Sequence, residues 1–259
     1  MDWPHPFDDF ADRVVLVTGG GTGIGAAVAQ AFAACGAQVA IHCNASTAEA
    51  EAVREAILST GGRADVFRAD LRDPAACGQL VDTVAATFGS VDVLINNAGN
   101  TFERQPTPAL DDAAFRQLVD LNFGAVFATS RAVVAHFRAQ GRGTIINTGS
   151  ISARIGGTDG TVVYAAAKAA VATFTRGLAR ELAPEGFRVN AVAPGVIDTR
   201  VHHRYTDPGV MAKFTAAIPM GRVASPHECA GAYLFLASEL LASFVTGQVI
   251  EVNGGQLMV

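Results

Sequence analysis

The fold is decided by the stretch Val14-Val15-Leu16-Val17-Thr18-Gly19-Gly20-Gly21-Thr22-Gly23-Ile24-Gly25. A continuous β-branched run passes directly into a glycine-rich turn, and an alanine-rich helical segment follows. Glycines at such a strand-to-helix turn let backbone amides approach a pyrophosphate, and the helix N-terminus adds free N–H groups and a positive dipole end. The stretch therefore predicts a nucleotide site, although a purely structural tight turn would use the same residues.

Strand-like and helical segments alternate along the rest of the chain. Strands are expected at 14–17, 39–41, 64–69, 91–95, 144–147, 189–192 and 249–252, and helices at 26–35, 47–60, 74–88, 111–139 and 163–183. Most strand segments are continuously apolar, as expected of strands covered on both faces. The alternation predicts an α/β fold: a Rossmann-type, doubly wound parallel sheet of about seven strands with helices on both faces. No linker or repeat divides the chain, so residues 1–259 are expected to form a single domain.

The composition argues against several classes of protein. The 259 residues include 19 Lys or Arg and 24 Asp or Glu, for a net charge of −5, and no basic cluster that would neutralise nucleic-acid phosphates. The four cysteines have neither C-x-x-C nor zinc-ligand spacing, which argues against a metal site or a disulfide framework and favours a reducing compartment. Neither a signal peptide nor a sufficiently apolar membrane span is recognised. We expect a cytoplasmic protein with no nucleic-acid or membrane partner.

Tyr164 and Lys168 are four residues apart in a helical segment, so their side chains project from one face of that helix. A tyrosine, with an ordinary pKa of about 10, serves as an acid or base near neutrality only if its anion is stabilised. A cation one helical turn away supplies that stabilisation. The pair is therefore a candidate for proton transfer, although a solvated helix face would show the same spacing.

The chain resembles the short-chain dehydrogenases/reductases. The motif Thr18-Gly19-x-x-x-Gly23-x-Gly25 is similar to the glycine motif of that family. The resemblance continues through Asn96-Asn97-Ala98-Gly99, Tyr164-x-x-x-Lys168, Pro194-Gly195-x-Ile197-x-Thr199 and Val252-Asn253-Gly254-Gly255. It covers nearly the whole chain, and it implies the strand order 3-2-1-4-5-6-7, a homotetramer, and hydride transfer between NADP or NAD and a small carbonyl or alcohol substrate.

The resemblance implies the catalytic residues Asn122, Ser150, Tyr164 and Lys168. Ser150 would polarise the substrate oxygen, Tyr164 would exchange its proton, and Lys168 would hold the tyrosinate and the nicotinamide ribose. Asn122 would hold a water in a relay to the lysine; a satisfied buried polar residue is the alternative. Ser150 precedes Tyr164 by 14 residues, one more than the usual family spacing, so Ser152 is a competitor for the serine role.

The resemblance also implies a set of cofactor-binding residues. Cys43 occupies the position where NAD-preferring members carry aspartate, and the arginine or lysine of strong NADP binders is missing at Thr22 and around Asn44. Neutral groups can still accept a phosphate, so NADP is favoured over NAD by a modest margin. The pair Asp70-Leu71 would contact the adenine; a plain strand cap is the alternative. The full set is Thr18, Gly19, Gly21, Thr22, Gly23, Ile24, Gly25, Cys43, Asn44, Ala45, Ser46, Asp70, Leu71, Asn97, Ala98, Gly99, Tyr164, Lys168, Pro194, Gly195, Val196, Ile197 and Thr199.

The function implied is an oxidoreductase of a ketone or secondary alcohol, with a 3-oxoacyl thioester as the first specific candidate. A sugar or polyol dehydrogenase is the alternative, because one scaffold serves both. A nucleotide-binding regulator without catalysis is disfavoured, since the catalytic set is complete. Residues 195–221 form a long irregular excursion of the kind that often makes a binding loop or lid. Its cationic candidates for an anionic substrate, which could equally be solvated, are Arg200, His202, His203, Arg204 and Lys213.

Overall fold

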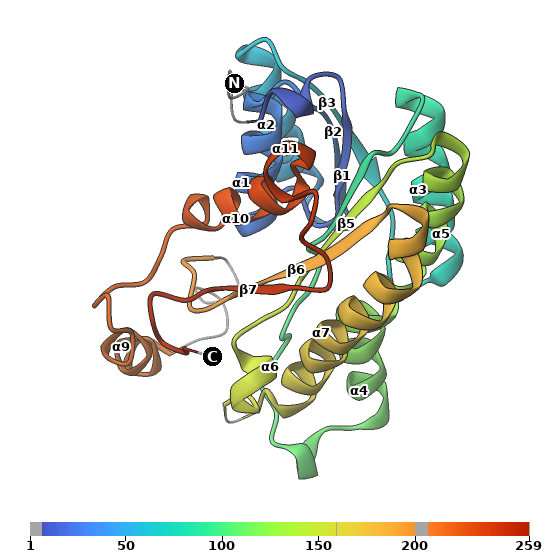
Figure 1. Ribbon diagram of the computed structural model, residues 1–259. Coiled ribbons are helices and arrows are strands. Elements are labelled where there is room, and N and C mark those ends of the chain that lie inside the picture. Colours follow the sequence, from blue (N-terminus) through green and yellow to red (C-terminus); the bar gives the residue numbers. More distant parts are fainter. Residues whose placement is uncertain (1–6, 159, 200–206, 259) are drawn as a thin grey trace.

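The computed structural model describes residues 7–158, 160–199 and 207–258. It is built on one parallel sheet with the strand order β3-β2-β1-β4-β5-β6-β7, and Figure 1 shows helices on both of its faces. The strands are β1 (Val14–Val17), β2 (Gln38–Cys43), β3 (Arg63–Arg68), β4 (Val93–Asn96), β5 (Thr144–Thr148), β6 (Arg188–Pro194) and β7 (Val249–Val252). The predicted fold class and strand order are confirmed. The bounds of β1 and β7 are those predicted, and the ends of the other strands differ from the prediction by at most two residues.

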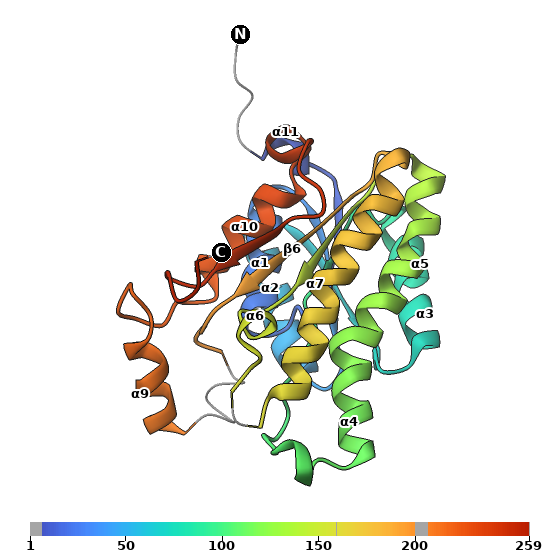
Figure 2. The ribbon, with the colours of Figure 1, turned by 60° about the horizontal axis from the view of Figure 1, so that its bottom comes forward.

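The helices form two layers (Figures 1 and 2). One face of the sheet is covered by α1 (Gly23–Ala34), α2 (Thr47–Ser59), α10 (His227–Ala237) and the short α11 (Glu239–Ala242), and the other by α3 (Pro74–Phe88), α4 (Asp112–Val119), α5 (Ala125–Gln140) and α7 (Val162–Leu182). Two further helices, α6 (Ser152–Ile155) and α9 (Pro208–Ala216), follow the carboxyl ends of β5 and β6. They add chain beyond the carboxyl ends of the strands.

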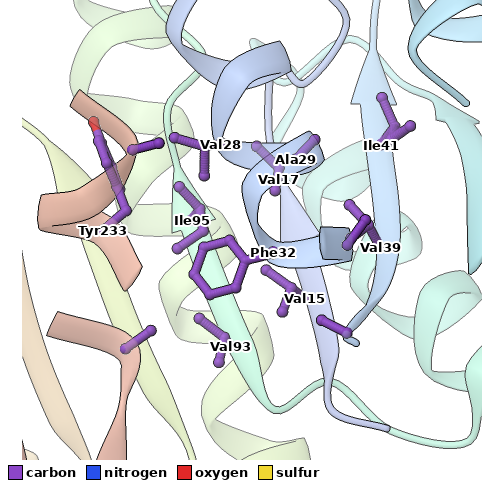
Figure 3. Packing of buried hydrophobic residues seen from close by; sticks show 14 of the residues in the cluster. Val15, Val17, Val28, Ala29, Phe32, Val39, Ile41, Val93, Ile95 and Tyr233 are labelled. Carbon is purple, nitrogen blue, oxygen red and sulfur yellow. The ribbon is translucent and has the colours of Figure 1, made fainter. Parts of the chain in front are cut away.

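Successive strand residues pack into two separate cores. Val15 and Val17 of β1 lie against Phe32 of α1, as Figure 3 shows. Val14 and Leu16 point to the opposite face and join the core under α3, α5 and α7. Because each strand is buried on both faces, the sequence reads as an unbroken apolar run rather than as an alternation.

The helix expected over 111–139 is interrupted. Its two α-helical parts, α4 and α5, are joined by a π-helical turn, Asp120–Gly124, in which Asn122 is fully buried. Such turns insert one extra residue and often occur at functional sites. Asn122 is therefore a residue of the π turn rather than of a regular α-helix. The whole stretch is long and apolar enough to cross a membrane, but it packs against α3 and α7 within the fold.

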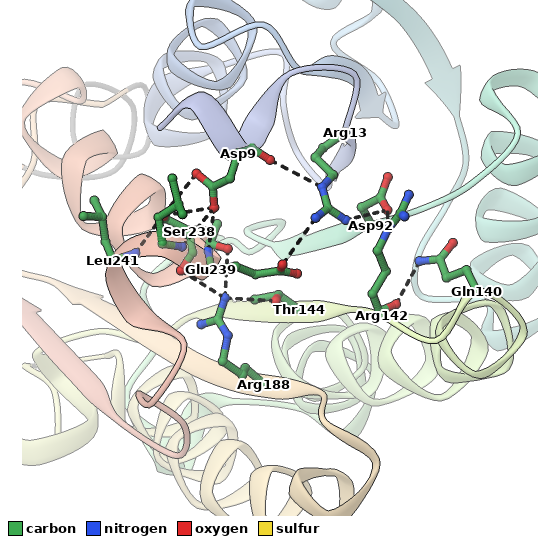
Figure 4. Close-up of polar contacts among 12 residues, drawn as sticks. Asp9, Arg13, Asp92, Gln140, Arg142, Thr144, Arg188, Ser238, Glu239 and Leu241 are labelled. Atoms are coloured by element: carbon green, nitrogen blue, oxygen red, sulfur yellow. Dashed lines mark hydrogen bonds and ion pairs between the residues drawn. The ribbon is translucent and has the colours of Figure 1, made fainter. Parts of the chain in front are cut away.

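A polar cluster closes the amino ends of the central strands (Figure 4). The Arg188 guanidinium donates to the carbonyl oxygens of Leu236 (2.6 Å) and Ala237 (2.8 Å) at the end of α10. Asp92 accepts from the Val14 amide (2.9 Å) and from Arg142 Nε (2.5 Å). These contacts hold the amino ends of the strands together. Ligands bind at the other end, beyond the carboxyl ends of the strands, in folds of this type.

All four cysteines are free thiols. Cys43, Cys77 and Cys229 are buried, and Cys35 is half-buried. Burial raises the pKa of Cys77 to about 11 and that of Cys229 to about 12. These two thiols are protonated at neutral pH and act as packing groups.

Candidate active site

The glycine turn after β1 has a backbone that only glycine fits. Gly19 and Gly23 have positive φ angles of +64° and +54°, and a Cβ at Gly25 would lie 2.2 Å from the Gly19 carbonyl oxygen. The Thr22 side chain does not cap α1, and no acidic residue occurs in the first turn of that helix. The positive end of the helix dipole is therefore open to an anion. This cradle fits the pyrophosphate of a dinucleotide.

Thr18 and Asn97 lock the turns after β1 and β4 together. Thr18 Oγ1 accepts from the backbone amides of Asn97 (2.9 Å) and Ala98 (3.0 Å). In return, Asn97 Nδ2 donates to the carbonyl oxygens of Thr18 (3.0 Å) and Gly19 (3.2 Å). Thr18 therefore shapes the floor of the site.

His42 supports the glycine turn from below. Its Nδ1 accepts from the Gly19 amide (3.1 Å), and its Nε2 donates to the Ala69 carbonyl oxygen (3.1 Å). The ring is 2% exposed, and burial lowers its pKa below the ordinary value. The imidazole is thus neutral and carries its hydrogen on Nε2. No sequence motif points to His42.

Three of the four predicted catalytic side chains converge beyond β5. Lys168 is 2% exposed, its Nζ donates to the Thr148 carbonyl oxygen (2.8 Å), and burial lowers its pKa to about 8. The same Nζ lies 5.8 Å from the centroid of the Tyr164 ring. Burial raises the pKa of Tyr164, and a hydrogen bond with Ser150 opposes this. The hydroxyl next to Tyr164 is therefore that of Ser150, and its Oγ also accepts from the Ser152 amide (3.1 Å).

Asn122 ties the π turn to the loop that follows β4. Its Nδ2 donates to the carbonyl oxygens of Asn100 (2.8 Å) and Leu118 (2.9 Å), and its Oδ1 accepts from the Asn100 amide (3.1 Å). Both amide hydrogens are used. A Cβ at Gly99 would lie 2.8 Å from Asn122 Oδ1 and 3.2 Å from Lys168 Nζ, so Gly99 is wedged between the two side chains.

A cavity of about 290 Å³ extends from the glycine turn to Tyr164 along the carboxyl ends of the strands. The predicted site residues that line it are Gly19, Thr22, Gly23, Ile24, Asn97, Ala98, Gly99, Ser150, Tyr164, Lys168, Pro194, Gly195, Val196, Ile197 and Thr199. The predicted site residues that do not line it are Thr18, Gly21, Gly25, Cys43, Asn44, Ala45, Ser46, Asp70, Leu71 and Asn122. The second group is divided between residues that shape the cavity walls and residues around the ends of β2 and β3.

The ends of β2 and β3 differ from the sequence expectation. Cys43 is fully buried and packs in the core under α1 and α2, with its Sγ 3.9 Å from Thr47 Oγ1. An arginine is present after all: Arg68 Nε donates to the Asn44 carbonyl oxygen (3.1 Å). Asp70 is half-buried and paired with Arg72 (2.5 Å), and Leu71 is buried in the core under α3.

Several cavity residues were missed from the sequence. Arg104, Phe214 of α9 and Gln256 line the cavity; Ser152, the predicted competitor of Ser150, lines it too. Gln256 directly follows the Val252-Asn253-Gly254-Gly255 motif, which could have drawn attention to it. Residues 200–206, with Arg200, His202, His203 and Arg204, lie outside the described residues, and Lys213 does not line the cavity. Within 7–158, 160–199 and 207–258, no group of three or more His, Cys, Asp or Glu side chains is placed to hold a metal ion.

A family model described as enoyl-(acyl carrier protein) reductase matches residues 19–256 of the chain. The chain belongs to the short-chain dehydrogenase/reductase family. This dehydrogenase/reductase is 42% identical over 246 residues to cis-4-hydroxycyclohexanecarboxylate dehydrogenase of Sinomonas cyclohexanicum, a match covering 95% of this chain and 97% of the relative. It is 37% identical over 251 residues to the 3-oxoacyl-[acyl-carrier-protein] reductase FabG of Escherichia coli K12, covering 97% and 100%.

Solved structures of the family superpose closely on this dehydrogenase/reductase. The NADH-dependent reductase A1-R′, responsible for alginate metabolism, has a TM-score of 0.90 and 35% identity, and the match covers 97% of this chain and 100% of that one. Related crystal structures hold NAD in one case and NADP in another. As a member of this family, the protein is an oxidoreductase.

Proposed function

We propose that the protein transfers a hydride reversibly between NADP(H) and a ketone or secondary alcohol. The observation that carries this proposal is the convergence of Ser150, Tyr164 and Lys168 in the cavity that begins at the glycine turn. The dinucleotide supplies the hydride chemistry when it is bound. The backbone of Gly19 and of residues 22–24 would hold its pyrophosphate, and the segments 97–99 and 194–199 would line the rest of its path.

The protein's own part is to polarise the substrate oxygen and to exchange its proton. The Ser150 hydroxyl donates to the substrate oxygen, and Tyr164 gives up its phenolic proton during reduction and takes it back during oxidation. A buried phenol resists ionisation, as its raised pKa indicates. The Lys168 ammonium next to the ring lowers the free energy of the tyrosinate. Asn122 hydrogen-bonds the Asn100 backbone and lies on the other side of Gly99 from Lys168. A water relay through Asn122 stays a prediction.

Substitution of the tyrosine tests the proposal most directly. Tyr164→Phe should lower kcat by about two to four powers of ten, the range of general acid–base groups, while the dissociation constant for NADPH stays unchanged in a fluorescence titration. Ser150→Ala should be nearly as damaging, and Ser152→Ala should be mild. If Ser152→Ala proves the more damaging of the two, the serine role belongs to Ser152.

We also propose that NADP is preferred because of Arg68. NADP carries a phosphate where NAD carries a ribose hydroxyl. Arg68 is paired with Cys43 across β2 and β3, and its guanidinium lies over the end of β2. Burial raises the pKa of Cys43, and the Arg68 charge lowers it; Glu49 and Glu51 act on the same thiol in the opposite sense to the arginine. The opposing charges limit the expected preference to about tenfold, or about 1.4 kcal/mol.

Arg68→Gln should shift the kcat/KM ratio for NADPH over NADH by about tenfold toward NADH. The dissociation constants of the two dinucleotides should shift by the same factor. Arg63→Gln is the matched control. Arg63 lies at the amino end of the same strand, far from the carboxyl end where Arg68 lies, and it pairs with Asp12. An unchanged ratio in the Arg68 variant would show that another residue sets the choice of cofactor.

The substrate class follows from a panel read at 340 nm with both reduced dinucleotides. A 3-oxoacyl thioester and a small cyclic or sugar-derived ketone represent the two classes of activity named among the relatives. Turnover of the thioester alone would establish an acyl reductase, and turnover of the small ketone alone would establish the sugar or polyol type. Binding of either dinucleotide without turnover of any ketone would support a regulator instead.

We propose further that the protein is a cytoplasmic homotetramer. Phe115 of α4 and Phe127 of α5 are 47% and 44% exposed, and Phe127 stacks edge-on against Phe174 of α7. An apolar aromatic surface of this kind usually marks an interface. Light scattering at micromolar concentration should give about four times the 26.7 kDa chain mass, and the monomer mass would contradict the proposal.

The proposed cytoplasmic location is supported by the four free thiols, which are typical of a reducing compartment. Cell fractionation tests it.

A further inference from the structure

Within the part of the chain that the structure describes, the charged side chains lining the cavity are all cationic. Lys168 and Arg104 contribute cations, and none of the described cavity residues is an aspartate or glutamate. Lys168 is buried against the Thr148 carbonyl oxygen and beside the Tyr164 ring. Arg104 belongs to the other part of the cavity wall, which also includes Phe214 and Thr158. An arginine keeps its charge at every pH at which an enzyme works.

Arg104 is held in place by two segments of the chain, α9 and the loop that leads into α7. Its guanidinium carbon lies 5.9 Å from the centroid of the Phe214 ring on α9, and Nη1 is 3.5 Å from Thr158 Oγ1. The next residue, Gln105, donates its amide to the Gly160 carbonyl oxygen (3.3 Å). A Cβ at Gly160 would lie 2.9 Å from Arg104 Cβ. The arginine is therefore packed against the loop that leads into α7, the helix that carries Tyr164 and Lys168.

A second polar group in the same cavity also points to a ligand. Gln256 lines the cavity, and its Oε1 is buried without a hydrogen-bond partner in the part of the chain that the structure describes. A buried acceptor left unsatisfied costs about 1–3 kcal/mol. A polar substrate with a hydroxyl or another hydrogen-bond donor in this part of the cavity would supply the missing partner of this oxygen.

We propose that the substrate is a small oxo or hydroxy carboxylic acid whose carboxylate is bound by Arg104. A guanidinium matches a carboxylate with two parallel hydrogen bonds, and this pairing orients the substrate as well as holding it. The inference rests on the proposed function, because it names the substrate class of that reaction. In the reduction, the carbonyl carbon gains the hydride from the dinucleotide and its oxygen gains the proton from Tyr164. The carboxylate is unchanged and serves only as the handle.

A matched pair of substrates tests this handle. With NADPH in excess, 4-oxocyclohexanecarboxylate and 4-methylcyclohexanone present the same ring ketone with and without a carboxylate. The wild type should favour the acid, and Arg104→Gln should lower kcat/KM for the acid by about 10- to 100-fold through KM, as expected for loss of a charge-assisted pair. For the neutral ketone the variant should match the wild type. Arg104→Lys keeps the charge but loses the two parallel N–H donors, so its kcat/KM for the acid should lie between those of the wild type and Arg104→Gln.

Arg116→Gln is the control, because Arg116 is an exposed arginine of α4 that does not line the cavity. A wild type that favours the neutral ketone, or equal losses on both ketones in Arg104→Gln, would overturn the inference. Calorimetry separates it from the proposed function. Cyclohexanecarboxylate should bind the NADP-saturated protein 10- to 100-fold more weakly in Arg104→Gln, even if neither ketone is turned over. An unchanged dissociation constant would overturn the inference independently of turnover.

Discussion

His42 joins the glycine turn to the segment after β3 through two hydrogen bonds that only the neutral ring makes. Protonation would place an N–H against the Gly19 amide in place of an acceptor. Burial lowers its pKa, and Asp70, the charged group that acts on it, opposes the shift. The folded pKa is therefore below the unfolded value of about 6.5. The stability that His42 contributes is present above pH 6.5 and is lost as the pH falls from there through the folded pKa.

We expect acidification to weaken dinucleotide binding through this residue. NADH is the suitable probe, because it lacks the phosphate monoester of NADPH, which titrates near pH 6. Its dissociation constant, measured by fluorescence between pH 7.5 and 5.5, should rise by up to about tenfold per pH unit once the ring protonates. His42→Asn keeps an acceptor near Gly19 and does not titrate, so its profile should be flatter. Identical profiles for wild type and variant would show that His42 does not control binding.

At the scale of elements, the π turn and the turn after β4 meet at Gly99. Gly99→Ala would place a methyl group within 2.8 Å of Asn122 Oδ1 and 3.2 Å of Lys168 Nζ, so one of them must move. We expect kcat to fall by at least about tenfold, because Lys168 would be displaced from Tyr164. Gly78→Ala on α3 is the control, since nothing lies within 4 Å of its added methyl group. It should leave kcat unchanged and raise the unfolding free energy by about 0.4–1 kcal/mol.

Elements and motifs that depend on neighbouring residues were predictable from the sequence. The glycine turn and the spacing of Tyr164 and Lys168 are local patterns, and the structure places all three on the cavity. The interruption at Asn122 was not predicted, because a π turn leaves the apolar pattern of the helix almost intact. Arg68, Arg104 and Gln256 reach their positions through strand pairing and loop packing between distant segments.

At the scale of the whole molecule, the polar cluster around Arg188 supports the amino ends of the strands, away from the site. Arg188 is 7% exposed, and burial lowers its pKa. Arg188→Met would leave the buried carbonyl oxygens of Leu236 and Ala237 without their donor, at about 1–3 kcal/mol each. Urea unfolding should show a loss of about 2–5 kcal/mol, with kcat per folded molecule unchanged. Arg138→Met, which breaks an exposed pair with Glu185, should have no measurable effect.

The protonated thiols bear on how the protein can be handled and damaged. Alkylating reagents and peroxide attack thiolates, and burial raises the pKa of all four cysteines, so little thiolate is present at neutral pH. The folded protein should therefore keep its activity after hours in iodoacetamide, with Cys35 as the first residue to be modified. Rapid labelling of Cys77 and Cys229 would then report that the layers of helices have separated from the sheet. The same two residues would serve as built-in probes of unfolding in a mixture of proteins.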